Sequence, residues 1–76
     1  MDIVALKQEY NGLLKRFKAG SAYLDNDSIP DLEKDDKLPA FIRILDRLNG
    51  ILFCFKENGI SYTDDNVLNG FTEVSV

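Results

Sequence analysis

The stretch from residue 38 to residue 59 constrains the fold more than any other part of the chain. Its apolar residues recur at alternating spacings of three and four, which is the periodicity of one face of an α-helix. The members of this row are Leu38, Phe41, Leu45, Leu48, Leu52 and Phe55. Pro39 suits the first turn of a helix, and Gly59 suits the left-handed residue that closes one. The sequence therefore predicts a long helix over about 39–58.

A second periodic stretch covers the start of the chain. Its apolar row also alternates spacings of three and four, with Gly20 as its one gap. The members of this row are Ile3, Leu6, Tyr10, Leu13, Phe17, Gly20 and Leu24. Asp2 suits the N-cap position, so we expect a helix over about 3–24. Gly20 is compatible with close approach of another backbone, with a bend, or with simple tolerance of a cost of about 1 kcal/mol relative to Ala.

The connector between the two rows carries its own start and stop signals. Residues 25–27 are Asp-Asn-Asp, which disfavours a helix interior, and Ser28 followed by Pro30 predicts a new helix start. We expect a short helix over about 30–36 that ends before Pro39, because the residue preceding a proline is pushed out of the α region. A connector this short makes the two long helices antiparallel neighbours.

The periodic pattern stops after Gly59. Thr63 suits the N-cap of a last short helix over about 64–69, with acidic residues in its first turn. Gly70 then ends that helix. The fold class predicted for the chain is all-α: an antiparallel helical hairpin with short accessory helices.

The last residues, 70–76, form a tail with some strand character. Phe71 and Val74 are costly to leave in water, so part of this tail is expected to pack back onto the hairpin. A chain of 76 residues fits one domain, and we take residues 1–76 as a single helical domain.

The second long helix has more apolar surface than one neighbouring helix can cover. Ile44 and Ile51 lie beside the predicted seam, and Phe53 lies well away from it. Two covers are available: the chain's own C-terminal segment, and a second copy, which would give a four-helix bundle of two-fold symmetry. We expect both at once, and a foreign protein is the remaining alternative. We predict a homodimer built on such coiled-coil seams. The predicted interaction surface consists of Ile44, Ile51, Phe53, Arg43 and Arg47.

Residue composition argues against catalysis and against a bound metal or cofactor. The chain has no histidine, so neither a Ser–His nor a Cys–His dyad can be built, and the commonest zinc sites are missing. The paired acids at 35–36 and 64–65 look like solvated helix-end carboxylates. A calcium loop starting at Asp25 fails because Ile29 replaces an oxygen ligand and Pro30 replaces the turn glycine. No small-molecule substrate is evident.

The charge balance argues against non-specific binding to nucleic acid. The formal net charge is −4 at pH 7, which a phosphate backbone would repel. An alternative function nevertheless follows from the few basic groupings: a small nucleic-acid-associated regulator. It would use Lys15, Lys18, Arg43 and Arg47. The acidic connector over 25–36 could instead oppose a basic partner, or serve as an ordinary hydrated linker.

The cellular location predicted from the sequence is the cytoplasm. Cys54 is the only cysteine, so an intramolecular disulfide is impossible and a reducing compartment is natural. Met1 is followed by an acidic residue and not by a signal peptide. The longest unbroken apolar run, residues 51–55, is far short of the roughly 20 residues that a membrane span needs.

Three segments of the chain are similar to segments of other proteins. Residues 6–17 read Leu-Lys-Gln-Glu-Tyr-Asn-Gly-Leu-Leu-Lys-Arg-Phe, residues 38–41 read Leu-Pro-Ala-Phe, and residues 62–71 read Tyr-Thr-Asp-Asp-Asn-Val-Leu-Asn-Gly-Phe. In these the chain resembles small helical proteins of Gram-positive phages and mobile elements. The resemblance implies an origin and brings no catalytic residues. Together with the apolar surplus, it suggests a non-enzymatic protein–protein interaction module, a phage or mobile-element accessory protein that modulates a host protein.

Overall fold

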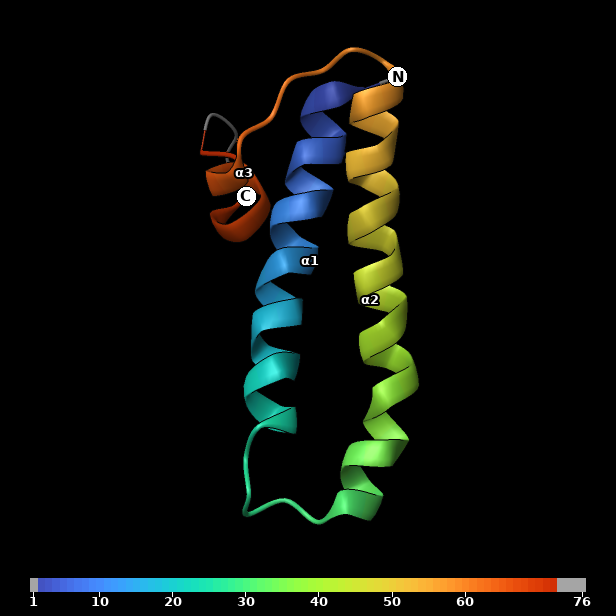
Figure 1. The fold of residues 1–76 in the computed structure, drawn as a ribbon, viewed down its shortest axis with the longest axis vertical. Coiled ribbons are helices and arrows are strands. Elements are labelled where there is room, and N and C mark those ends of the chain that lie inside the picture. The colour runs from blue at the N-terminus through green and yellow to red at the C-terminus, as the bar shows by residue number, and fades with distance from the viewer. Residues whose placement is uncertain (1, 73–76) are drawn as a thin grey trace.

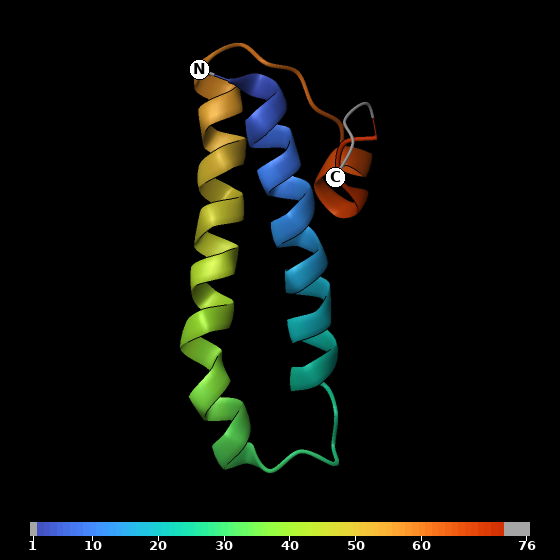
Figure 2. The ribbon, with the colours of Figure 1, turned by 180° about the vertical axis from the view of Figure 1, so that it is seen from behind.

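The protein is an all-helical hairpin with a third, short helix beside it. A computed structural model describes residues 2–72, and over that range the elements are α1 (Ile3–Leu24), α2 (Asp31–Glu57) and α3 (Asp64–Asn69). Figure 1 shows α1 and α2 running antiparallel, with the connector at one end and α3 on the flank of α1. The view from behind agrees (Figure 2). The molecule is elongated, about 43 × 20 × 19 Å. The all-α prediction is confirmed.

The first helix has the bounds that the sequence predicts. Asp2 is its N-cap, and its Oδ1 accepts a hydrogen bond from the backbone N–H of Ala5 at 3.0 Å. This bond satisfies one of the donors that every helix start leaves without a partner. Local capping chemistry alone is therefore enough to place this end of α1.

The second helix is longer than predicted, because Pro39 lies inside it. The expected break at residues 37–39 is wrong: the predicted helices over 30–36 and 39–58 form one continuous helix, drawn without interruption in Figure 1. Pro39 removes a single backbone N–H, and its side chain is exposed. The helix continues because the apolar residues after the proline are anchored against α1, and this packing outweighs the local preference.

The start of α2 also differs from the prediction. Ser28 does not cap it; Pro30 is the N-cap, in extended conformation, with no side-chain capping bond. The backbone N–H of Ser28 instead donates to Oδ1 of Asn26 at 2.9 Å, closing a turn within the connector. The Asn26 side chain therefore organises this bend.

The other helix ends follow the predicted signals. Gly59 adopts a positive φ of 70°, and the Ile60 N–H donates to the carbonyl of Phe55 at 2.8 Å, as in a Schellman closure. Thr63 caps α3 through a reciprocal capping box with Asn66. These predictions are confirmed.

The core is built where α1, α2 and the residues after α3 meet. Its buried members are Tyr10, Leu14, Leu48, Ile51, Phe55 and Phe71. The prediction that Phe71 packs back is confirmed, since its side chain is only 2% exposed. Val74 and the rest of the predicted tail beyond residue 72 lie outside the described residues.

The second helix is rotated relative to the predicted seam. Ile51 is 1% exposed inside the core, and Ile44 packs against that core. Two members of the predicted seam, Leu38 and Leu45, are exposed instead. Of the covers considered for Ile44 and Ile51, the chain's own packing is the one that the structure shows, and the expectation that both residues lie beside the seam and not in it is wrong. The seam that packs inside consists of Phe41, Ile44, Leu48, Ile51 and Phe55, and Leu52 of the predicted row packs beside it. The inner seam keeps the heptad spacing but is shifted around the helix.

Candidate interaction surface

An exposed row of four apolar residues and one asparagine runs along α2 on the side that α1 does not cover. We name it the α2 row. Its members follow one another at spacings of four, three, four and four: Leu38, Ile42, Leu45, Asn49 and Phe53. Ile42 is 46% exposed and Phe53 63% exposed, so they are large apolar side chains in contact with water. Such a stripe, at the periodicity of a helix contact, is the feature of this chain most suited to binding another protein.

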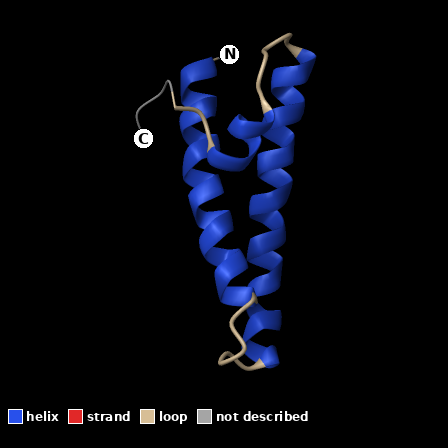
Figure 3. Cartoon of the chain, turned by 60° about the vertical axis from the view of Figure 1, so that its left-hand side comes forward, coloured by secondary structure: helices blue, strands red, loops and turns tan. Residues whose placement is uncertain are grey.

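An apolar groove of about 240 Å³ borders the α2 row. Leu45 and Asn49 belong both to the row and to the groove wall, and Leu68 of α3, which is largely exposed, lines the other side. Figure 3 shows α3 lying across this side of the hairpin. The exposed apolar surface therefore extends from α2 over the groove toward α3.

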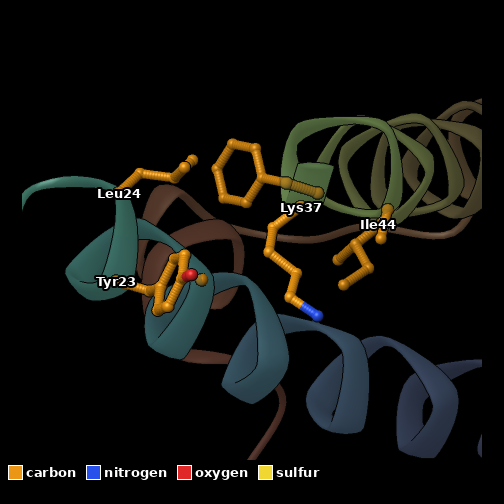
Figure 4. Close-up of a pocket in the computed structure, with 7 residues that line it drawn as sticks. Tyr23, Leu24, Lys37 and Ile44 are labelled. Carbon is orange, nitrogen blue, oxygen red and sulfur yellow. The ribbon is translucent and has the colours of Figure 1, made fainter. Parts of the chain in front are cut away.

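A second apolar cleft, of about 210 Å³, lies near the connector. Figure 4 shows Lys37 and Ile44 projecting from α2 toward α1, opposite Tyr23. Gly20 forms part of its wall: a Cβ added there would lie 2.9 Å from a ring carbon of Phe41. Of the three explanations for Gly20 left open by the sequence, the structure supports close approach, but by an aromatic ring and not by a backbone.

The basic residues predicted as functional do not form one patch. Arg47 donates two hydrogen bonds to the carboxylate of Glu9 on α1, at 2.5 and 3.0 Å. Lys18 lies nine residues beyond Glu9 on the same helix. That separation is roughly two and a half turns, so Lys18 points to the opposite side of α1. Lys15 and Arg43 are exposed.

Among the described residues, three groups have a shifted pKa, each for a local reason. The hydrogen bonds from Arg47, with its charge, hold the pKa of Glu9 below its usual value, and the same contact raises the pKa of Arg47. Burial, with a smaller effect from Tyr62, raises the pKa of Tyr10, whose hydroxyl donates to the carbonyl of Val67 at 2.8 Å. Each of these three pKa values therefore lies farther from 7 than the ordinary value of its group.

The predicted interaction surface is thus divided by the structure. Phe53 is exposed on the α2 row, whereas Ile51 is enclosed in the core. Arg47 is held in its ion pair with Glu9. The sequence-based reasoning missed Ile42 and Asn49, although the spacing of Leu38, Ile42 and Leu45 was itself a helical signal.

Three other features of the structure concern metal sites, membrane-spanning helices and free cysteines. Within residues 2–72, no group of three or more Cys, Asp or Glu side chains gathers closely enough to hold a metal ion. None of the helices in the described part of the chain has the length and apolar character needed to cross a membrane. Cys54 is half-buried on α2.

Comparison with protein-family models, with curated proteins and with solved structures finds no match to this chain. Its function is therefore argued from its own surface.

Proposed function

We propose that this chain is a non-enzymatic protein–protein interaction module that forms a homodimer through the α2 row. The observation that carries the proposal is the exposure of this row, which continues for about four turns along one helix.

The exposure of single apolar side chains supports self-association. Within the α2 row, Phe53 is 63% exposed, Ile42 46%, Leu38 40% and Leu45 37%. Packing against a second copy would remove these side chains from water.

The geometry of the row favours a two-fold arrangement. A homodimer uses the same patch on both copies, and two α2 helices packed antiparallel through their rows would bring four long helices together. The result is a four-helix bundle of the kind expected from the sequence. In this arrangement Leu45, at the middle of the row, lies beside its own equivalent in the second copy.

The wider biological role is part of the same proposal. The chain acts in a reducing cytoplasm, which suits the single Cys54. As a phage or mobile-element accessory protein, it would use the surface left over in the dimer to modulate a host protein.

The test is the mass of the free protein in solution, measured by sedimentation across roughly 1–500 µM, a range that spans weak to firm association. We expect twice the 8.6 kDa chain mass for the wild type. Ile42→Lys should give a monomer, because it places a charge within the apolar contact.

The matched control is Leu32→Lys. Leu32 is 76% exposed on the same helix but lies outside the α2 row, so this variant should remain a dimer. A monomeric wild type, or equal loss of the dimer in both variants, would refute the role of the row.

A further inference from the structure

The residues just after α3 are held by the hairpin as a bound peptide would be. The side-chain amide of Asn11 contacts both main-chain groups of Phe71: its Oδ1 accepts from the Phe71 N–H at 2.6 Å, and its Nδ2 donates to the Phe71 carbonyl at 2.8 Å. One side chain thus satisfies the backbone donor and acceptor of a single residue. Pairing of this kind recognises a main chain whatever its sequence.

The ring of Phe71 fills a pocket that recognises an aromatic side chain. It lies edge-on to Tyr10, with ring centres 5.5 Å apart, and edge-on to Phe55 at 5.6 Å. The ammonium of Lys7 lies 5.2 Å from the centre of the Phe71 ring. Edge-to-face contacts and a nearby cation are both geometries that favour an aromatic ring.

The residue before Phe71 is restricted to glycine. Gly70 has a φ of 87°, in the left-handed region, and a Cβ there would lie 2.5 Å from Oδ1 of Asn11. Any side chain at this position would push away the oxygen that holds the Phe71 N–H. The site is therefore selective for two consecutive residues, a glycine followed by a phenylalanine.

Phe71 is the main anchor of the segment after α3, since its side chain is 2% exposed in the core. The residues of α3 add less, because none of them is buried and α3 packs on α1 but not on α2. The hydroxyl of Tyr10 adds a hydrogen bond to the carbonyl of Val67. Ile60 and Tyr62, which precede α3, also pack against the core, so release of the segment after α3 requires Phe71 to leave its pocket.

We propose that Lys7, Tyr10, Asn11 and Phe55 form a binding site for a Gly-Phe segment, and that residues 70–71 are its tethered ligand. Because the tether gives an effective concentration in the millimolar range, the site is closed by its own chain at ordinary protein concentrations. When the segment is released, the site accepts the equivalent segment of a second copy. No residue of the α2 row takes part, so the proposal goes beyond the function given above.

The experiment uses the full chain with Phe71→Ala, which empties the aromatic pocket, and a labelled peptide spanning residues 63–72. We expect saturable binding by fluorescence anisotropy, about tenfold or more tighter than to the wild type, whose site is occupied in cis. A matched peptide carrying Gly70→Ala should not bind. Absence of binding to the variant, or equal binding of the two peptides, would overturn the proposal.

The test also holds if Phe71→Ala is unfolded. The natural peptide should then restore the helical circular dichroism signal, and the Gly70→Ala peptide should not. An unchanged signal with both peptides would likewise overturn the proposal. The sedimentation result for Ile42→Lys does not depend on either outcome.

Discussion

The contact between Gly20 and Phe41 gives a prediction that separates helix propensity from packing. Phe41 on α2 stacks on Phe17 of α1, with ring centres 4.9 Å apart and planes 22° from parallel. Gly20 is the residue that leaves room for this pair, because a Cβ there would meet the Phe41 ring at 2.9 Å. Gly12 lies in the same helix with nothing within 4 Å of an added Cβ. The two glycines are therefore a matched pair.

The magnitudes follow from this difference. Replacing a glycine by alanine inside a helix stabilises by about 1 kcal/mol, and Gly12→Ala should show that full gain. At Gly20 the same gain is opposed by overpacking, which costs about 1–3 kcal/mol in a packed site. We expect Gly20→Ala to be less stable than the wild type by about 1 kcal/mol. The two variants should thus differ by about 2 kcal/mol.

The assay is thermal and urea unfolding followed by circular dichroism, at one protein concentration because association shifts apparent stability. In a domain of this size, 1 kcal/mol moves Tm by roughly 4–8 °C. In a Phe41→Leu background, Gly20→Ala should regain most of its stabilisation, because the opposing ring is gone. If Gly20→Ala stabilises the wild type as much as Gly12→Ala does, the reasoning is refuted.

Two further predictions concern Pro39 and the ion pair between Glu9 and Arg47. Pro39→Ala should stabilise the chain by about 2 kcal/mol, since a mid-helix proline costs roughly 3 and its stiffening of the unfolded chain returns at most about 1; urea unfolding would contradict this by showing no gain. The pKa of Glu9 is lowered in the folded state, so its ion pair with Arg47 stabilises the fold at pH values above the ordinary glutamate pKa. This contribution is lost as the pH falls through the lower pKa of the folded state. Arg47→Gln should therefore lower the midpoint of urea unfolding slightly at pH 7, because the pair is largely exposed and screened by water, and should leave it unchanged at pH 2; an equal decrease at both pH values would contradict the prediction.

The parts of the fold that the sequence predicts correctly are those governed by local chemistry. The cap at Asp2, the capping box at Thr63 and the left-handed Gly59 each act over a few residues, so the ends they mark can be read directly. Pro39 is a position at which prediction from local sequence fails. Its local preference predicts a break, but packing farther along α2 keeps the helix whole.

The periodicity of the sequence does not determine which face of α2 packs against α1. Two apolar rows share Phe41, Leu48 and Phe55, and each has helical spacing, so the sequence permits either row to face α1. The inner row is fixed by contacts between distant residues, among them Phe41 with Gly20 and Phe55 with Phe71. The sequence-based prediction took the other row as the inner one and so placed Leu38 and Leu45 against α1. For that reason it did not identify the exposed surface of α2 to which they belong.

The site at Asn11 was beyond the reach of sequence reasoning for a related cause. Asn11 and Phe71 are 60 residues apart, and neither belongs to a recognised motif. An asparagine in the middle of a helix is usually a solvated residue. Only the return of the chain after α3 shows that this amide holds a main chain.

The most direct test of the central claim is cysteine cross-linking at the middle of the α2 row. With Cys54 replaced by Ser, Leu45→Cys should form a disulfide-linked dimer on mild oxidation, because antiparallel packing places this residue beside its equivalent. Leu32→Cys, more exposed but outside the row, should stay monomeric under the same conditions. Dimers from Leu45→Cys alone are the predicted result. No cross-linking at position 45, or cross-linking as strong at position 32, would contradict self-association through the α2 row.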